Sequence, residues 1–346
     1  MIVESAVPEL KQFPRVLLGH YPTPLEDLPR LSANYPGHRL LIKRDDCTGL
    51  GMGGNKVRQL EYYLGDAVSQ GCDTVLSTGA IQSNYMRTLA AAASKLGLES
   101  HIQLENRVPK ESKEYNTSGN RLLTEIFGAT IYSYPEGEDE EGADREIRSI
   151  AAGLQESGKK PYVVPLAPVK FPKGALGYIE MAAELDWQLN SGGVSHDLVV
   201  VPSGSGLTHA GTLFGLRLAG NNVPVVGACV RRSADLQRDR IINHCVNLAE
   251  AIGIPNPVAD DDIWIDDRAL APGYGQMSEP LGRAIRAMAT QEGILLDPVY
   301  SGKTLACLLL MLEAGELEQY ENIVFIHTGG SPALFAYQDD IESAVL

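Results

Sequence analysis

Short apolar runs and amphipathic segments alternate along most of this chain. Runs rich in Val, Ile, Leu and Tyr predict strands, and the segments between them carry apolar residues at helical spacing. The predicted strands are 38–46, 73–77, 100–104, 130–134, 161–165, 197–203, 223–230 and 321–328. The predicted helices are 55–70, 84–96, 118–127, 143–157, 175–189, 207–219, 279–293 and 303–314.

This alternation predicts an α/β fold with two open, mostly parallel sheets, about nine strands in all, and helices on both faces. The 346 residues, 44% of them hydrophobic, are enough for two domains. In such folds ligands bind beyond the carboxyl ends of the strands, in the turns that begin helices. The glycine-rich turns of this chain are therefore the first places to look for a site.

Charge and cysteine content narrow the class of partner. The formal net charge of −15 repels phosphate backbones, so we expect no nucleic-acid and no membrane partner, although a local pocket can still be basic. The five cysteines are scattered, with no CxxC and no zinc-like Cys/His spacing, so we expect reduced thiols and no metal site. The first 19 residues carry charges and prolines where a signal peptide needs an apolar run, which predicts a cytoplasmic protein.

The acidic stretch "PEGEDEEGADREIR", residues 135–148, stands out against this background. It runs directly into a helical pattern. We interpret it as a loop followed by a solvated helix start, where carboxylates suit the helix dipole.

Three turns between a strand and a helix carry polar residues. In "VVVPSGSGLTHAG", the turn Ser203–Thr208 is either an anion cradle or an ordinary turn. In "STGAIQSNYM", Gln82, Ser83 and Asn84 crowd one turn, which indicates either a helix cap or a site for a small carboxylate. In "IHTGGSPALFAY", Thr328 is either a cap or a donor to a ligand.

Lys56 poses a similar choice in "GMGGNKVRQLEYYLGDA". It is either a solvated lysine in a first helical turn or a reactive amine held at a helix start. Tyr274 lies between glycines in "APGYGQM", and Tyr300 and Ser301 follow Asp-Pro in "LLDPVYSGKTLA". Tyrosines in such turns are usually packing residues with a wet hydroxyl, but they can also lie over a ligand.

Together these segments resemble the aminocyclopropane-carboxylate deaminase and D-cysteine desulfhydrase family, pyridoxal-phosphate enzymes of the tryptophan synthase β-subunit fold type. The resemblance covers nearly the whole chain in order, from "FPRVLLGHYPTPLEDLPRL" through "IKRDDCTGLGMGGNK", "GAIQSNYMRTLAAAASKLGL" and "SGSGLTHAG" to "EGILLDPVYSGK" and "FIHTGGSPALFAY". It implies a homodimer acting on a small amino acid, with pyridoxal 5'-phosphate between a larger domain, 1–54 and 168–346, and a smaller one, 55–167.

The resemblance also implies roles for individual residues. Lys56 would bind the cofactor as a Schiff base, and Asn84 would hydrogen-bond its phenolic oxygen. The cofactor-binding set would be completed by Ser203, Gly204, Ser205, Gly206, Leu207, Thr208, Ser301 and Thr328. Gln82, Ser83, Asn84 and Tyr85 would bind substrate, with Gln82 and Ser83 on its carboxylate. Tyr274 and Tyr300 would flank the reacting carbons, and Lys56, Ser83 and both tyrosines would be catalytic.

The chain departs from the family pattern at three places. Gln59 stands where a second lysine is frequent, and Tyr85 stands where histidine is frequent. The loop "PLAPVKFPKGALGY", residues 165–178, replaces a small polar turn and carries Lys170 and Lys173. These two lysines are either solvated, or one of them, Lys170 above all, pairs with an anionic substrate side chain.

Ser301 bears on the reaction, because aminocyclopropane-carboxylate deaminases have a glutamate there that pairs with the pyridine nitrogen. A neutral partner weakens the electron sink, which favours expulsion of a β-leaving group. We therefore expect β-elimination from a substrate such as D-cysteine or a sulfonated analogue, giving pyruvate and ammonia, with Lys56 or a tyrosine as base. Two alternatives stay open: a ring-opening deaminase, and a pyridoxal-phosphate or ligand-binding protein without turnover.

Overall fold

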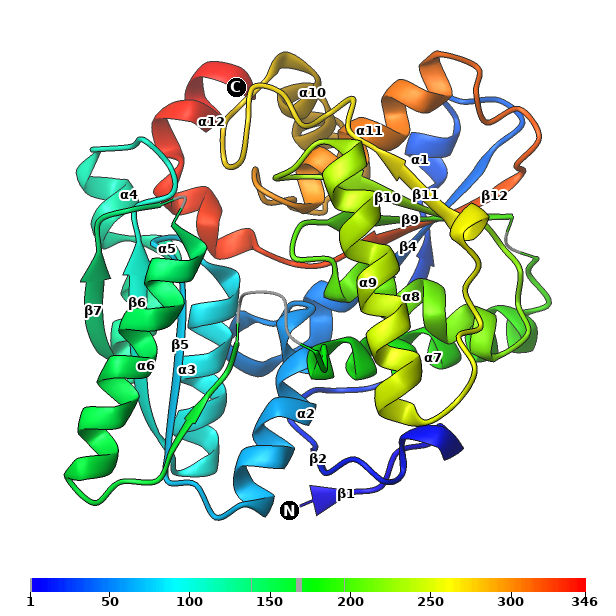
Figure 1. Cartoon of the computed structure of the whole chain (residues 1–346). Helices are drawn as coiled ribbons and strands as arrows, with labels where there is room; N and C mark the ends of the chain where they lie inside the picture. Colours follow the sequence, from blue (N-terminus) through cyan, green and yellow to red (C-terminus); the bar gives the residue numbers. More distant parts are fainter. Residues whose placement is uncertain (1, 138, 166–169, 196) are drawn as a thin grey trace.

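The computed structural model describes residues 2–137, 139–165, 170–195 and 197–346. Two mostly parallel sheets lie side by side, with four strands in one and six in the other, and helices cover both faces of each (Figure 1). This confirms the predicted α/β class. The domain boundaries at 54/55 and 167/168 stay predictions, and the second of them lies outside the described residues.

The larger sheet has the strand order β11 (Ile263–Asp266), β10 (Val225–Cys229), β9 (Leu198–Ser203), β12 (Asn322–His327), β4 (Arg39–Arg44), β3 (Leu25–Asp27). All neighbours are parallel except β3, which runs antiparallel to β4. Val199 and Val201 of β9 enter one core, and Leu198 and Val200 enter the other. Both faces are therefore buried, which explains the unbroken apolar run of this strand.

Helices on the larger sheet divide between its two faces. The core on one side contains residues of α7 (Leu176–Gly192), α8 (Leu207–Leu218) and α9 (Ala234–Ile252). The core on the other contains residues of α1 (Pro29–Ser32), α10 (Glu279–Ala287) and α11 (Ser301–Glu313). A separate antiparallel pair, β1 (Ile2–Val3) and β2 (Arg15–Val16), lies beside α2 near the N-terminus (Figure 1).

The smaller sheet has the order β7 (Thr130–Tyr134), β6 (Glu99–Glu105), β5 (Thr74–Ala80), β8 (Pro161–Val163), and all its strands are parallel. On one face, Val75 packs in a core formed with α2 (Lys56–Ser69) and α3 (Asn84–Leu96). On the other, Leu76 packs against Ile147 and Ala151 of α6 (Glu140–Glu156).

Several elements differ from the sequence prediction. The helix α3 has the predicted bounds, whereas the segment predicted as one helix over 279–293 is α10 followed by a π-helical turn, Met288–Glu292. The helix α6 begins at Glu140, three residues before the predicted start. Elements that the pattern did not predict are β1, β2, β3, β11, α1, α9, α4 (Lys113–Thr117) and α12 (Gln338–Ala344). The helix predicted over 118–127 is α5 (Gly119–Ile126).

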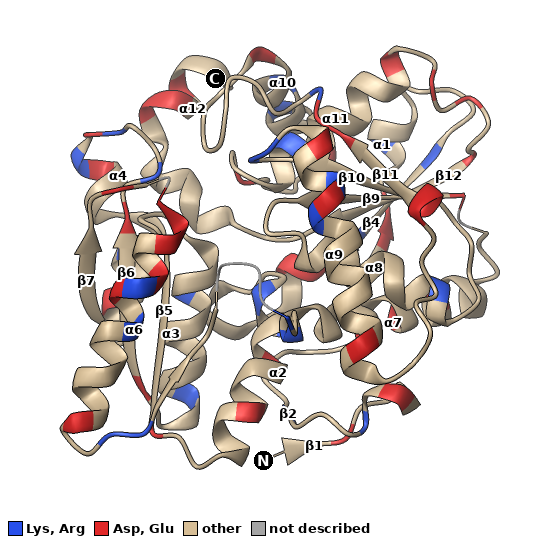
Figure 2. Ribbon diagram, viewed as in Figure 1, with Lys and Arg blue, Asp and Glu red and all other residues tan. Residues whose placement is uncertain are grey.

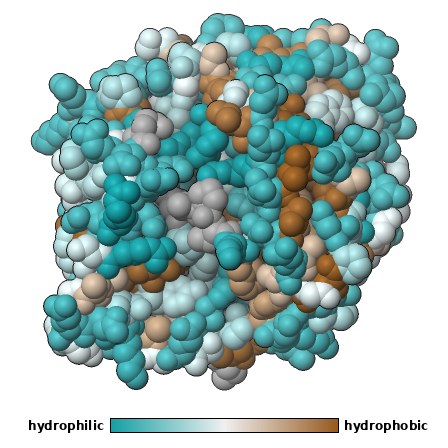
Figure 3. All heavy atoms as spheres, in the orientation of Figure 1, coloured by the Kyte–Doolittle hydropathy of each residue, from teal (hydrophilic) through white to brown (hydrophobic). Residues whose placement is uncertain are grey.

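The acidic residues that give the chain its negative net charge are spread over the molecule. Acidic and basic positions are spread over the layers of both sheets (Figure 2). On the face shown in Figure 3, hydrophilic residues predominate and hydrophobic ones form small patches. Within the described ranges, no helix combines the length and the apolar character that a membrane span requires.

Candidate active site

A cavity lies where loops after β5 and β9 face each other, at the carboxyl ends of strands from both sheets. Its lining includes ten residues that the sequence singled out: Lys56, Gln59, Ser83, Asn84, Tyr85, Gly204, Ser205, Leu207, Tyr274 and Tyr300. The turns that begin α2, α3 and α8 thus meet around one space, as expected for an open α/β sheet.

Lys56 is the first residue of α2, and the backbone before it is held tightly. Gly53 has φ +69°, and a Cβ there would lie 1.9 Å from the carbonyl oxygen of Asp46. The Gly53 carbonyl accepts a hydrogen bond from Arg87 Nη2 at 2.6 Å. The Asn55 amide donates to the carbonyl of Thr328 at 3.0 Å. The glycine cluster therefore lets the backbone pack closely against the segments after β4 and β12. This close packing places Lys56 at the cavity.

The Lys56 side chain is partly buried at the cavity, and withdrawal of its amine from solvent lowers its pKa to about 8. Its Nζ atom lies 5.6 Å from the centre of the Tyr85 ring. A lysine with this pKa is partly neutral near neutral pH, so it can act as a nucleophile or a base. This geometry favours the reactive amine over the solvated lysine.

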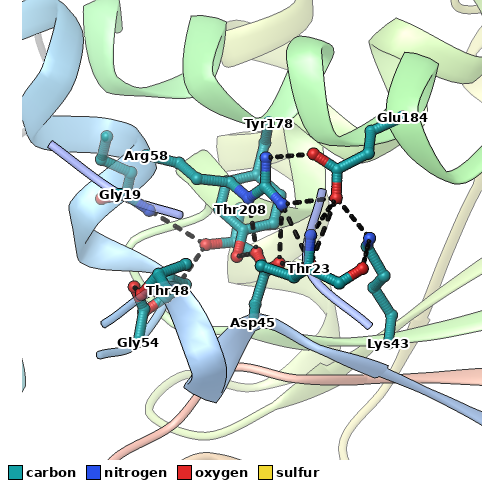
Figure 4. A network of polar contacts seen from close by, with 12 residues as sticks. Gly19, Thr23, Lys43, Asp45, Thr48, Gly54, Arg58, Tyr178, Glu184 and Thr208 are labelled. Carbon is teal, nitrogen blue, oxygen red and sulfur yellow. Dashed lines mark hydrogen bonds and ion pairs between the residues drawn. The ribbon is translucent and has the colours of Figure 1, made fainter. Parts of the chain in front are cut away.

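A buried ion-pair network anchors α2 two residues further on (Figure 4). Arg58 donates to both carboxylate oxygens of Asp45 at 2.9 Å, and to Glu184 of α7 at 3.0 and 3.1 Å. Lys43 of β4 pairs with the same Glu184, and the Tyr178 hydroxyl donates to Asp45 at 2.6 Å. Two cations meet two carboxylates here, so the network is formally neutral. It joins α2 and α7 to the C-terminal end of β4.

The turn before α8 has the geometry of an anion cradle. Gly206 has φ +93°, and a Cβ there would meet His244 at 2.8 Å, so only glycine fits. The first amides of α8 have no partner inside the helix. Thr208 Oγ1 accepts from Asn55 Nδ2 at 2.9 Å and from Gln59 Nε2 at 3.0 Å, which leaves its own hydrogen free to donate.

Ser203 has a different place from the rest of this turn. Its hydroxyl lies 3.1 Å from His209 Nδ1 and accepts from Gln237 Nε2 at 2.8 Å, and the residue is fully buried. The side chain therefore stabilises the turn from behind.

The turn before α3 splits its polar residues between structure and cavity. Ser83 caps α3, with its Oγ accepting from the Met86 amide at 3.3 Å, and it also lines the cavity. The side-chain Nε2 of Gln82 donates to the Tyr115 carbonyl at 2.6 Å, and its Oε1 accepts from the backbone amide of Asn120 at 2.9 Å. Gln82 thus binds the α4–α5 segment, away from the cavity lining.

Tyr274 and Tyr300 form a pair at the cavity, with hydroxyl oxygens 2.9 Å apart and rings edge to face. Burial raises the pKa of both, so the pair is neutral near neutral pH. The Tyr300 ring contacts Gly204, where a Cβ would lie 3.3 Å from Cε1. Two hydroxyls in contact can pass a proton between them.

Asp297, which the sequence analysis did not single out, fixes the turn that carries Tyr300 and Ser301. Its buried carboxylate accepts from the amides of Val299, Tyr300 and Ser301 at 2.7–3.0 Å and from Ser301 Oγ at 2.6 Å. Ser301 is fully buried, so its hydroxyl needs a partner within the protein, and it donates its hydrogen to the Asp297 carboxylate. The signal in the sequence is an aspartate just before a turn, because an aspartate side chain often accepts a hydrogen bond from the amide two residues on.

The two loop lysines lie away from the cavity lining. Lys173 pairs with Asp66, and Lys170 is exposed beside a separate hollow near Phe171. Thr328 contributes its backbone carbonyl to Asn55, and its side chain is not among the lining residues described. The residues between the loop lysines and β8, 166–169, lie outside the described part of the chain.

Four charged residues line the cavity that sequence reasoning missed: Arg107, Glu140, Arg231 and Arg240. They come from the segment after β6, the start of α6, the segment after β10, and α9. No local motif joins them, and each alone is typical of a solvated surface.

Comparisons with known proteins agree on one family. Residues 16–329 match the family described as "Pyridoxal-phosphate dependent enzyme". The chain is 42% identical over 333 residues to a D-cysteine desulfhydrase of Yersinia pestis (strain Pestoides F), which covers 96% of this chain and 98% of the relative. A D-cysteine desulfhydrase of Salmonella paratyphi A is 41% identical over 332 residues, with 96% and 98% covered. A crystal structure described as an ACC deaminase homologue has a TM-score of 0.87 at 38% identity, covering 97% of this chain and 98% of that one.

Proposed function

The chain belongs to the family of pyridoxal-phosphate dependent enzymes, and on that premise we propose that it is a β-eliminating lyase. Its substrate would be a small amino acid with a leaving group on Cβ, and its products pyruvate and ammonia. D-Cysteine is one candidate substrate, because D-cysteine desulfhydrases are 41–42% identical over nearly the full chain. The observation that carries the proposal is Lys56, a partly buried amine with a lowered pKa beside an anion cradle and a tyrosine pair.

The residues of the cavity fit the cofactor. Lys56 offers an amine, the start of α8 offers amides, and Thr208 offers a hydroxyl hydrogen. Gln59 Oε1 and Tyr85 OH are buried and have no hydrogen-bond partner among the described residues. Orphaned polar atoms in a cavity lining indicate that a polar ligand completes the site.

Each group has a role in the proposed reaction. When bound, pyridoxal phosphate supplies an electron sink for negative charge at the substrate's Cα. Ser83 binds and orients the substrate carboxylate at the start of α3, and the side-chain amide of Asn84 donates to the cofactor. Lys56, once neutral, removes the Cα proton of an L substrate. For a D substrate the base would be Tyr274 as its phenolate, the form that the Tyr300 hydroxyl and the Arg107 guanidinium favour against burial. The Tyr274–Tyr300 contact then gives the abstracted proton a path between two oxygens.

The first prediction tests the cofactor and the reaction together. Borohydride reduction of the holoenzyme should fix the cofactor on Lys56, and a panel of β-substituted D- and L-amino acids should release pyruvate. Lys56→Arg should lose about three orders of magnitude or more in kcat, because it removes both covalent binding and the base.

Lys303 is the matched control for labelling. Its amine is also buried with a pKa lowered to about 8, but it donates to the carbonyls of Leu270 and Gly273 and does not line the cavity. Cofactor found on Lys303, or a protein that binds no pyridoxal phosphate, would contradict the proposal.

Ring opening is the second candidate reaction, favoured by the 38% identical ACC deaminase homologue. Ser301 argues against it, because its neutral hydroxyl stands where ring-opening relatives have a carboxylate. The same assay separates the two reactions. Rapid 2-oxobutyrate release from aminocyclopropane-carboxylate would overturn the preference for β-elimination.

Oligomeric state and location are parts of the same proposal. We propose a homodimer, supported by exposed apolar residues on α5 and the segment Ser331–Ala336. We also propose a cytoplasmic location, supported by five free cysteines, three of them buried.

A further inference from the structure

The loop between β11 and α10, residues 267–278, carries Tyr274 to the cavity (Figure 1). It contains no helix or strand. A backbone hydrogen bond such as the one from Gln276 to Gly273, at 3.3 Å, closes a turn within the loop and does not tie it to another element. The position of Tyr274 therefore depends on the contacts that the loop makes with the rest of the molecule.

One such contact comes from Lys303, in the first turn of α11. Its amine donates to the carbonyl of Leu270 at 2.6 Å and to that of Gly273 at 2.9 Å. These two carbonyls lie on either side of the exposed tip of the loop, residues 271–272. The Gly273 carbonyl belongs to the peptide bond that leads into Tyr274. Lys303 thus fixes the backbone immediately before that residue.

The amine of Lys303 is buried without a counter-ion. Lys43 is also fully buried, but it pairs with Glu184. Among the described residues no carboxylate lies within ion-pairing distance of Lys303, and burial lowers its pKa to about 8. An apolar side chain would fill the same space without the cost of withdrawing a cation from water. What the structure gains from a lysine here is the pair of hydrogen bonds to the loop.

Close packing restricts the loop on the other side of Tyr274 in the sequence. Gly275 has φ +64°, and a Cβ there would lie 2.7 Å from the Tyr337 hydroxyl. The Tyr274 ring packs against the apolar cluster to which Tyr337 belongs. Lys303 before Tyr274 and this packing after it hold the side chain where its hydroxyl oxygen lies 2.9 Å from that of Tyr300.

Both tyrosines are positioned from the start of α11. Tyr300 is the N-cap residue of this helix, and Asp297 accepts a hydrogen bond from its amide at 3.0 Å. Lys303 lies three residues further along and holds the loop of Tyr274. One helix start therefore sets the place of both hydroxyls, directly for Tyr300 and through Lys303 for Tyr274.

We propose that Lys303 is a positioning residue, which holds Tyr274 at the cavity and against Tyr300 through the carbonyls of Leu270 and Gly273. The inference rests on the proposed function, in which the Tyr274 phenolate takes the Cα proton of a D substrate and becomes the neutral phenol. That transfer requires the phenolate oxygen within hydrogen-bond reach of the proton. The Tyr300 hydroxyl stabilises the phenolate only while the two oxygens stay in contact.

The first measurement does not depend on turnover. It is amide hydrogen exchange of the peptide 268–278, in the apoprotein and in the holoenzyme. Lys303→Met removes both hydrogen bonds and should speed exchange there at least about tenfold, whereas Lys303→Arg keeps the donors and should stay close to wild type. Lys95→Met is the control, because Lys95 is exposed on α3, donates to the Leu18 carbonyl at 3.2 Å and does not line the cavity. Unchanged exchange in Lys303→Met would overturn the proposal.

Turnover of β-chloro-D-alanine then shows whether Lys303 acts through Tyr274. Lys303→Met should lower kcat about a hundredfold with little change in KM, since a base displaced by about 1 Å loses that much. Lys303→Arg should restore most of the rate. In the Tyr274→Phe background, adding Lys303→Met should lower kcat by no more than about twofold, because residues that act as a unit are not additive. A merely structural role would lower kcat by the same factor in both backgrounds.

Each remaining outcome has its own meaning. If Lys303→Met does not fold, Lys303→Gln, which keeps one donor group on a shorter side chain, takes its place with the same expectations. Faster exchange with an unchanged kcat would show that Lys303 holds the loop without positioning the base, and the proposal would be wrong. A wild type that releases pyruvate from β-chloro-L-alanine alone would also overturn the proposal, while the lyase function stands. If neither enantiomer yields pyruvate, the lyase function fails, and the exchange measurement decides whether Lys303 holds Tyr274.

Discussion

At the scale of single residues, the position of Lys56 explains most of the local sequence around it. Glycines on its N-terminal side allow close backbone approach, and Arg87 and Thr328 fix that approach with backbone hydrogen bonds. The amine has no carboxylate within ion-pairing distance among the described residues, so burial alone acts on its pKa. The residue is therefore prepared to react before any ligand arrives.

Capture of the cofactor by the apoprotein should report this pKa. Only the neutral amine attacks a carbonyl, and burial lowers the pKa of Lys56 to about 8. The capture rate should therefore rise as the pH approaches 8 and level off above it. Stopped-flow absorbance across pH values from about 6 to 10 measures the midpoint. A rate that keeps rising through pH 10, as for an ordinary lysine, would contradict the assignment, and Lys56→Arg supplies the baseline.

The sequence predicted the site residues that lie in short turns between a strand and a helix, and it did not predict the site residues that lie elsewhere. Lys56, Asn84 and Tyr300 lie in strand-to-helix turns with distinctive composition, so local pattern and family resemblance both point to them. Arg107, Glu140 and Arg240 come from unrelated segments, and their proximity is a property of the fold. The acidic stretch was interpreted as a solvated helix start, yet its Glu140 meets three arginines.

At the scale of elements, a helix or strand could be predicted where its apolar residues recur with a clear helical or strand period. The helix α3 is almost entirely buried and has a capping serine and a glycine end, so its bounds matched the prediction. The helix α9 was missed because polar and charged residues dilute its apolar positions, Ile241, Cys245, Leu248 and Ile252, although these keep helical spacing. The strands β3 and β11 are short and lie at sheet edges, where little apolar sequence is needed.

The network beneath α2 should control stability in acid. Arg58 and Lys43 lower the pKa of Glu184 below its usual 4.5, so this carboxylate stabilises the fold above that pH and ceases to do so as the pH falls through its folded value. Glu184→Gln should cost about 3 kcal/mol in the free energy of unfolding at pH 7, since two buried cations would then share one carboxylate.

The difference between Glu184→Gln and wild type should narrow below about pH 4.5, the ordinary pKa of Glu184, when urea unfolding is repeated in acid. Glu250→Gln, at an exposed position of α9, is the control and should stay within about 0.5 kcal/mol of wild type. A Glu184→Gln deficit that is the same at pH 7 and in acid would show that the carboxylate's charge is not what matters.

At the scale of the whole molecule, an apolar patch offers a place for a second copy. Leu122 and Ile126 lie four residues apart on α5 and are 44% and 65% exposed. Phe335, 68% exposed, lies on the adjoining segment Ser331–Ala336, and its carbonyl accepts from Ser118 Oγ at 3.2 Å. Large apolar side chains that are exposed together on one face indicate a surface that another protein chain covers.

Phe335→Asp should therefore weaken self-association by about 2 kcal/mol or more, roughly 30-fold in the dissociation constant. Sedimentation velocity over a dilution series measures the change. Trp187→Asp is the matched control, because that aromatic is 59% exposed on α7, against the other sheet. A monomeric wild type, or a dimer indifferent to Phe335→Asp, would refute the assignment of this patch.

The place of β12 has a consequence for how the protein is made. This strand comes last along the chain, yet it lies between β9 and β4 in the middle of the larger sheet. During synthesis, β3 and β4 emerge early, but the other edge of β4 has no partner until β12 is made, whereas the smaller sheet is complete once residue 163 has left the exit tunnel. A late stop codon would thus remove the strand that joins the two halves of the larger sheet. Until translation ends, the edges of β4 and β9 that β12 joins therefore expose unpaired backbone groups, which can pair with other chains.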